Sequence, residues 1–117
     1  MIERKIYWAK DRNKNPHPII CLKIAGTSTI EGAVITSDCG YGNIPMEERY
    51  FLKEDSKGQP YSIRYKPSYL IRNKFKKYEI DLDQEPYGEL SEEGFNFVQE
   101  ALREYGACYF PYPIWKK

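Results

Sequence analysis

Short apolar stretches alternate with polar turns through residues 1–78, the pattern of a protein built from β-strands. Apolar residues of one parity predict a strand over residues 2–8. The continuous apolar run "IICLKI" (19–24) is rich in β-branched residues and too short for a helix, so it predicts a buried strand. "IEGAVIT" (30–36) predicts the next strand.

The middle of the chain continues this pattern, with turn residues at short intervals. "RYFLKE" (49–54) and "QPYSIRY" (59–65) flank "DSKG", which predicts a hairpin whose turn ends in glycine. "SYLIRNKF" (68–75) extends the β-pattern, whereas "SDCGYGNIP" (37–45) has the glycine, asparagine and proline content of a loop. Five or six short strands at this spacing are typical of a small barrel.

One helix is predicted near the end of the chain, over about residues 91–105. Apolar residues recur there at helical spacing, Ser91 suits the N-cap, and Gly106 suits the position that closes a helix. Residues 107–117 contain two prolines and four aromatic residues, which predicts an extended arm. We therefore expect residues 1–117 to form a single domain, a mostly β barrel with one C-terminal helix against it.

Composition narrows the class of protein. With 117 residues, 41% hydrophobic and 30% charged, the chain is long enough to bury a core without disulfides or a metal. The three cysteines are widely spaced and form no CxxC pair, which argues against a zinc site and favours a reducing cytoplasm. No apolar run approaches the roughly 18 residues of a membrane span, and no signal-peptide pattern opens the chain. We expect a cytoplasmic protein without metal, other cofactor or membrane partner.

Charge is distributed unevenly along the chain. Residues 1–78 carry 15 Lys and Arg against 8 Asp and Glu, whereas residues 79–104 carry one Arg against nine acidic residues. A basic front is compatible with a bound polyanion such as RNA. It is equally compatible with a basic part and an acidic part of the chain that neutralise each other's charge within the fold.

The residues that can carry chemistry gather at two strand ends. His17, the only histidine, stands between two prolines just before the 19–24 run, either as a turn residue or as a proton-transfer group near neutral pH. Thr36 and Ser37 close the 30–36 strand, where they can cap a turn or donate hydroxyl hydrogen bonds to a ligand. The residues alone leave both alternatives open.

Three segments in order carry a resemblance to a known family. They are "HPIICLKI", "EGAVITS" and "DCGYGNIPM", followed by the "SYLIR" strand and the "GELSEEGFNFVQEAL" helix. Over residues 15–104 the chain resembles the MazF/PemK toxins. The resemblance implies an SH3-like barrel of five to six antiparallel strands with one C-terminal α-helix. It also implies a metal-independent endoribonuclease of a bacterial or phage toxin–antitoxin system, which cleaves single-stranded RNA by attack of the 2′-hydroxyl.

In that family an arginine usually stands immediately before the proline of the first motif and a threonine ends the second, and both act on the scissile phosphate. These positions fall on His17 and Thr36, with Ser37 beside them, so the resemblance implies His17, Thr36 and Ser37 as catalytic residues. With histidine in place of arginine, this position has an imidazole, which can transfer protons near neutral pH, instead of a planar and permanently charged guanidinium. The resemblance also implies a homodimer and a cognate antitoxin that occupies the RNA groove.

Basic and aromatic residues near these motifs predict an RNA-binding surface. The loop before His17 borders the RNA groove in the family, and "RYKPSYLIRNKFKK" interleaves cations with aromatic residues, as single-strand-binding surfaces do. The alternative for this run is an edge strand kept soluble by its lysines. The residues expected to bind RNA are Lys10, Arg12, Lys14, Tyr41, Arg64, Lys66, Arg72 and Lys74.

A function of another class is a non-catalytic barrel of the same shape that binds a protein or nucleic-acid partner. The two functions differ in one structural respect. An enzyme requires His17 and Thr36 to converge on one open groove with room for a phosphate.

Overall fold

The structure is a computed structural model that describes residues 1–13, 16–63 and 65–109. Eight strands, one α-helix and two short 3₁₀ helices follow one another along these residues. They are β1 (Lys5–Tyr7), β2 (Ile19–Ile24), β3 (Thr29–Thr36), β4 (Ile44–Met46), η1 (Glu48–Tyr50), β5 (Ser68–Leu70), β6 (Lys74–Tyr78), η2 (Glu79–Asp81), β7 (Gly88–Glu89), α1 (Glu92–Ala101) and β8 (Ala107–Tyr109).

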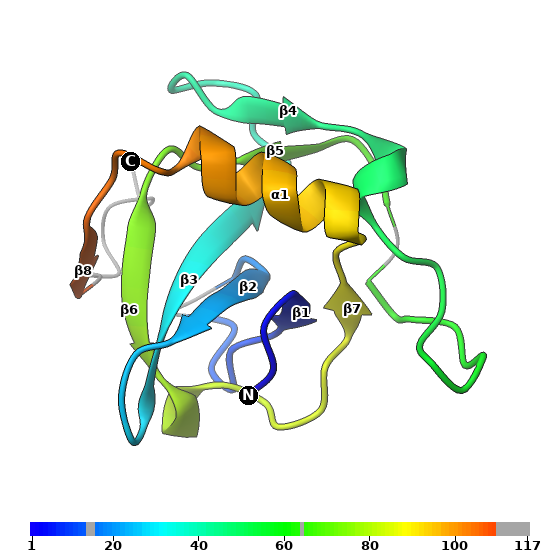
Figure 1. Cartoon of the computed structure of the whole chain (residues 1–117), viewed down its shortest axis with the longest axis horizontal. Coiled ribbons are helices and arrows are strands. Elements are labelled where there is room, and N and C mark those ends of the chain that lie inside the picture. Colours follow the sequence, from blue (N-terminus) through cyan, green and yellow to red (C-terminus); the bar gives the residue numbers. More distant parts are fainter. Residues whose placement is uncertain (14–15, 64, 110–117) are drawn as a thin grey trace.

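The strands form one strongly curled sheet, with α1 lying across it (Figure 1). The order along the sheet is β4-β5-β3-β2-β1-β7, and β6 pairs with β3 beside this path. All these pairs are antiparallel, and only the short β8 pairs in parallel, with β6. The predicted fold class, a mostly β barrel-like globule of antiparallel strands with one helix, is confirmed.

The β2–β3 hairpin is the centre of this sheet. Its register pairs Ile19 with Val34 and Ile24 with Ile30, with a shift after Cys21 that marks a β-bulge. The other edge of β3 is shared, because its first half pairs with β6 and its last residues pair with β5. One eight-residue strand therefore connects both halves of the curled sheet.

Both faces of the hairpin are buried, which explains the continuous apolar run of β2. Ile20 and Leu22 join the core cluster that also contains Val98 and Leu102 of the α1 region. Ile19 and Cys21 point the other way, into a second cluster. A strand covered on both sides needs apolar residues at every position rather than at alternate ones.

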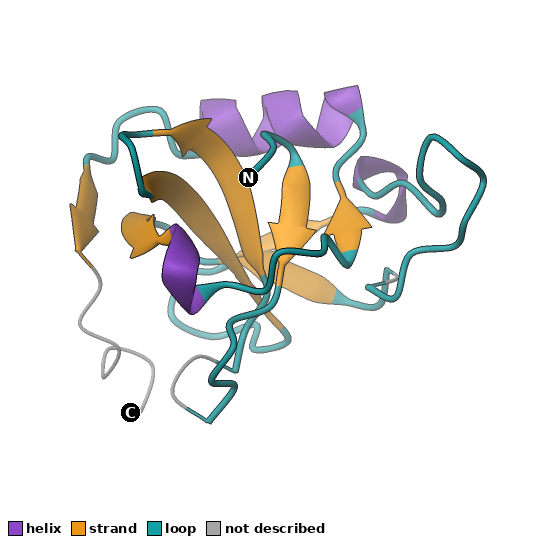
Figure 2. Ribbon diagram, turned by 90° about the horizontal axis from the view of Figure 1, so that it is seen from below, coloured by secondary structure: helices purple, strands orange, loops and turns teal. Residues whose placement is uncertain are grey.

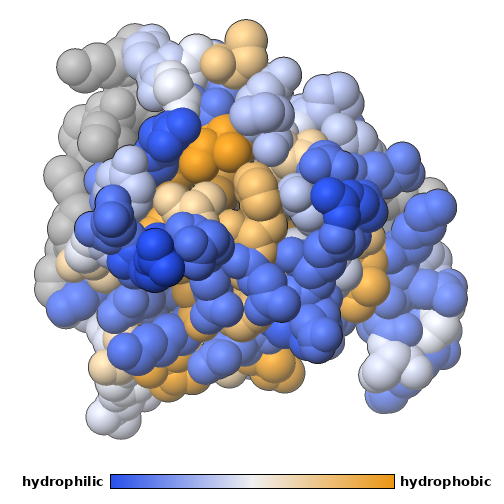
Figure 3. Space-filling view, turned by 45° about the horizontal axis from the view of Figure 1, so that its top comes forward, coloured by the Kyte–Doolittle hydropathy of each residue, from blue (hydrophilic) through white to orange (hydrophobic). Residues whose placement is uncertain are grey.

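Helix α1 begins where the sequence predicts and ends earlier. The Ser91 side chain accepts a hydrogen bond from the Gly94 N–H at 3.0 Å, as an N-cap does. The backbone leaves the helical path at Leu102, so the helix closes at Ala101, and Gly106 does not occupy its C-cap. Figure 3 shows the face on which α1 and β4 lie, largely hydrophilic, with apolar areas at its centre and toward its lower edge.

Gly94 lies where α1 touches η1. A Cβ atom built on Gly94 would lie 2.2 Å from the backbone oxygen of Tyr50. Only a residue without a side chain allows the two backbones to approach this closely. The glycine that weakens the helix pattern in the sequence is thus a packing requirement of the fold.

Other predicted strands differ from the structure. The 49–54 and 59–65 stretches form no regular hairpin, because η1 replaces part of the first, although Gly58 does sit at a tight turn with a φ of 81°. The first strand shortens to β1 because Arg4 adopts a left-handed conformation, with a φ of 77°. The predicted 68–75 strand is divided between β5 and β6 by the three residues 71–73.

Of the predicted arm, Ala107–Tyr109 forms β8, and residues 110–117 lie outside the described residues. Within the described residues, no helix has the length and apolar character needed to cross a membrane. Seen from below, α1 lies on one side of the curled sheet, and most of the loops lie on the other (Figure 2).

Candidate functional site

The open end of the β2–β3 hairpin brings His17 and Thr36 together. The Ile35 N–H donates to the Pro18 carbonyl at 3.1 Å, which extends the pairing of Ile19 with Val34 by one residue. His17 and Thr36 are the next residues along the two segments, and both border the same two cavities. Two residues 19 positions apart in the sequence therefore leave the sheet side by side.

Two cavities meet at this point. The first, here called the Trp8 cavity, has a volume of about 400 Å³, and Trp8, Phe51, Tyr65 and Lys66 border it. The second, the Tyr41 cavity, measures about 540 Å³ and is bordered by Tyr41, Asn43, Ile71, Arg72, Asn73 and Phe75. His17, Thr36 and Ser37 line both cavities. The three predicted catalytic residues thus occupy the boundary between two adjoining hollows.

His17 is half-buried at this boundary. Burial disfavours its charged form and lowers the pKa of the imidazole from the usual 6.5. The ring is therefore mainly neutral at pH 7, and in a neutral imidazole one of the two nitrogens carries a lone pair rather than a hydrogen. This is the protonation state that a general base requires and that a fixed phosphate-binding cation lacks.

Thr36 and Ser37 present two hydroxyl groups beside His17. Thr36 is buried, and its Oγ1 accepts a hydrogen bond from the Asp38 N–H at 3.1 Å, so the turn-capping interpretation is confirmed for this residue. A hydroxyl that accepts one hydrogen bond still has its own hydrogen to donate. Ser37 is exposed at the same strand end. The site therefore combines a fixed hydroxyl with an accessible one.

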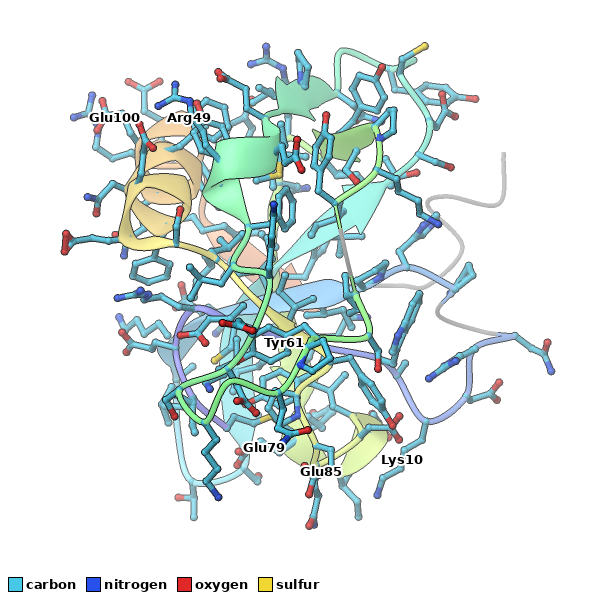
Figure 4. The ribbon with its side chains drawn as sticks, turned by 90° about the vertical axis from the view of Figure 1, so that its right-hand side faces the viewer. Lys10, Arg49, Tyr61, Glu79, Glu85 and Glu100 are labelled. Carbon is cyan, nitrogen blue, oxygen red and sulfur yellow. The ribbon has the colours of Figure 1, made fainter. Side chains whose placement is uncertain are left out.

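The loop after Ser37 ends in a tight turn that displays Tyr41. Tyr41 and Gly42 have φ values of 60° and 72°, and the Asn43 N–H donates to the Gly40 carbonyl at 3.1 Å. These are the features of a type I′ turn. The Arg72 Nε donates to the Gly42 carbonyl and ties the turn to the residues after β5. Figure 4 shows this loop on the side of the molecule opposite α1.

Aromatic residues form the wall of the Trp8 cavity. The rings of Phe51 and Tyr65 lie 5.7 Å apart, and the Tyr65 hydroxyl donates to the Met46 carbonyl at 3.3 Å. Trp8 carries the Arg12 guanidinium over its ring, 4.5 Å from the ring centre. This arrangement offers flat apolar surfaces with a positive charge close by, which suits a nucleobase and its phosphate.

The predicted RNA-binding residues divide into three groups. Tyr41 and Arg72 line the Tyr41 cavity, and Lys66 lines the Trp8 cavity. Lys10, Arg12 and Lys74 border neither cavity. The Arg12 guanidinium lies over the Trp8 ring, and its Nη2 is 3.8 Å from the Asp83 Oδ2. Figure 4 places Lys10 at the opposite end of the molecule from Arg49 and Glu100. Lys14 and Arg64 lie outside the described residues.

Several residues that border the cavities were not among the site residues predicted from the sequence. Trp8 and Phe51 come from segments that the sequence predicts as strands, and the structure brings both residues to the border of the Trp8 cavity. Asn43 and Asn73 stand in loops where asparagine is ordinarily a turn residue. Their proximity to His17 depends on strand register, which the sequence pattern alone does not give.

Comparison of the chain with models of protein families, with curated proteins and with solved structures found no match. Within the described ranges, no group of three or more His, Cys, Asp or Glu side chains is placed to hold a metal ion. The chemistry of the site therefore has to be inferred from the residues at the two cavities.

Proposed function

We propose that this chain is a metal-independent endoribonuclease of the MazF/PemK type that cleaves single-stranded RNA by attack of the 2′-hydroxyl. The observation that carries the proposal is the position of His17, Thr36 and Ser37 on the shared boundary of the two cavities. A base that titrates below 6.5 stands there beside two hydroxyl donors. Such a set of groups meets the needs of phosphoryl transfer to a neighbouring hydroxyl.

In the proposed reaction, the neutral His17 imidazole takes the proton of the 2′-hydroxyl as its oxygen attacks phosphorus. The bond between phosphorus and the 5′-oxygen breaks, and the 5′-oxygen takes a proton from water. The products are a 2′,3′-cyclic phosphate and a free 5′-hydroxyl. Thr36 and Ser37 donate hydrogen bonds to the phosphoryl oxygens as negative charge accumulates on them.

The surroundings supply the positive charge and the flat surfaces that an RNA strand requires. Lys66 borders one cavity and Arg72 the other, so a cation stands on each side of the catalytic residues. Tyr41 and Trp8 offer rings for base stacking. The binding energy from these contacts would come from phosphates and base faces rather than from base pairing.

The family resemblance adds two partners to this proposal. MazF/PemK toxins are usually homodimers, and a cognate antitoxin inhibits them by occupying the RNA groove. For this chain, the groove is the pair of cavities on either side of His17. A segment of antitoxin bound there would cover the catalytic residues and the two cations together.

The test is cleavage of a long unstructured RNA in EDTA by the native chain and by His17→Ala, followed by analysis of the fragment ends. Lys10→Ala is the matched control, because Lys10 is exposed and borders neither cavity. We expect fragments ending in 2′,3′-cyclic phosphate from the native chain and the control. His17→Ala should lose at least a hundredfold in rate, the usual contribution of a general base.

Each other outcome has a definite meaning. Equal cutting by all three proteins assigns the activity to other residues or to a contaminant and refutes the role of His17. No cutting by any of them, with folded proteins by circular dichroism, refutes the enzyme and leaves the non-catalytic binding barrel as the alternative.

A further inference from the structure

The exposed ring of Tyr41 is the feature of this site that folding explains least. Tyr41 is 78% exposed, so its ring adds little to the core. Its backbone occupies the left-handed region, which glycine, asparagine and aspartate tolerate better than tyrosine. A large aromatic residue at a strained and exposed turn position suggests a function in binding.

The turn that carries Tyr41 is held from several directions. The Gly40 N–H donates to the Asp38 carboxylate at 2.7 Å, and the Asn43 side chain donates to the Asp38 carbonyl at 2.9 Å. Arg72 adds a bond to the Gly42 carbonyl from outside the loop. A ring mounted on a turn fixed in this way loses little freedom when a base stacks on it.

Two further residues that border the same cavity, Arg72 and Asn73, carry hydrogen-bond donors. The Asn73 Oδ1 accepts from the Lys74 N–H at 2.9 Å, and the amide group of the same side chain has two hydrogens that it can donate. Arg72 uses Nε on the turn and keeps its terminal nitrogens for other acceptors. Paired donors of this kind match the O6 and N7 acceptors of guanine, whereas adenine presents a donor in place of O6.

We propose that the Tyr41 cavity is a nucleotide subsite that stacks a base on Tyr41 and selects guanine through Arg72 and Asn73. This inference rests on the proposed function, since a phosphate at His17, Thr36 and Ser37 has one nucleotide in each adjoining cavity. The Tyr41 cavity then determines the base on one side of the cut, and the Trp8 cavity accommodates the nucleotide on the other side.

Binding of mononucleotides tests the subsite without any cleavage. The chain is titrated with the 3′- and 5′-monophosphates of guanosine, adenosine, cytidine and uridine, and amide shifts of residues 37–43 and 71–73 are followed by NMR. We expect guanosine monophosphate to bind about tenfold more tightly than the others. The attachment of the preferred phosphate, 3′ or 5′, shows on which side of the cut the subsite lies.

Variants separate stacking from base selection. Tyr41→Ala should weaken all four nucleotides by about tenfold, whereas Tyr41→Phe keeps the ring and should bind as the native chain does. Asn73→Ala should remove the preference for guanosine and leave the other three affinities unchanged. Any other order of affinities, or an order that Asn73→Ala leaves intact, overturns the assignment.

The two proposals can fail separately. Guanosine-selective binding in a protein that cuts no RNA refutes the endoribonuclease and leaves the subsite. Cleavage through His17 without a guanosine preference refutes the subsite and leaves the endoribonuclease.

Discussion

Replacing Gly94 by alanine tests the contact between α1 and η1. In an isolated helix this change would add about 1 kcal/mol of stability, because alanine is the better helix former. In this fold the new methyl group would stand 2.2 Å from the Tyr50 oxygen and 2.8 Å from the Tyr50 Cα. Ordinary contact begins near 3.4 Å, so α1 and η1 have to separate by about 1.2 Å.

That separation has two costs. Overpacking of this kind costs roughly 1–3 kcal/mol. The movement also stretches the bond from the Ser91 N–H to the Tyr50 carbonyl, now 2.9 Å, and the bond from the Ser91 hydroxyl to the Arg49 carbonyl, now 2.8 Å. Losing one of them costs about 1 kcal/mol. After the helix gain is subtracted, we expect a net loss of about 2 kcal/mol in the free energy of unfolding.

Denaturation in urea, with the midpoint and slope compared between variants, measures this loss. Gly106→Ala is the matched control, because no atom lies within 4 Å of a Cβ built there and its backbone is outside the left-handed region. The control should stay within about 1 kcal/mol of the native chain. A Gly94→Ala variant as stable as the native chain would refute the close contact and the reasoning from it.

Four further predictions concern the site and its support. Because burial lowers the pKa of His17, kcat/KM for RNA cleavage should rise as the pH increases toward 6.5 and stay level above it. For the same reason, the free energy of unfolding should fall as the pH drops below 6.5, because the unfolded chain then binds the proton more readily than the folded chain does. His17→Gln should remove this contribution to the pH dependence of stability. Tyr41→Gly should raise the free energy of unfolding by about 1 kcal/mol in a urea titration while it weakens binding of single-stranded RNA, because it relieves the left-handed backbone and removes the ring. Tyr61→Phe should lower the free energy of unfolding, measured by thermal denaturation, by roughly 1.5 kcal/mol or more, because the Tyr61 hydroxyl donates to the Glu89 carboxylate at 2.6 Å. Ser91→Ala should cost about 1 kcal/mol of stability by removing the N-cap of α1, as measured by the midpoint of chemical unfolding.

Elements with a strong local signal could be predicted from the sequence. The 19–24 strand agrees with β2 at both ends, and its first four residues are all apolar because both faces of the strand are buried there. Ser91 marks the start of α1 because an N-cap depends on neighbouring residues alone. The end of the helix could not be predicted in the same way, since Leu102 is fully buried and leaves the helix while its apolar spacing continues.

The predicted hairpin over residues 49–65 shows a different limit. Its turn signal is correct, because Asp55 and Gly58 form a hydrogen-bonded turn with Gln59. The flanking residues alternate as strands do, yet tertiary contacts decide their conformation: η1 meets α1, and Phe51 pairs only at an isolated bridge with Leu90. Tertiary contacts override the strand propensity of a segment more readily than they override the preference of turn residues for a turn.

The candidate site could be predicted in part. Its central pair, His17 and Thr36, needs only the register of one hairpin, and both residues border the two cavities. The placement of basic residues is harder to predict, because a charged side chain close to the site in sequence can lie away from the cavities in the structure. Lys10 is an example, since it borders neither cavity.

The position of β3 has a consequence for how the molecule opens. Because its two edges are hydrogen-bonded to β2, β5 and β6, its central amides cannot reach solvent until several neighbours have detached at once. Hydrogen exchange there should follow the global unfolding equilibrium. Thr36, the last residue of this strand, therefore belongs to the element of the fold that we expect to open last.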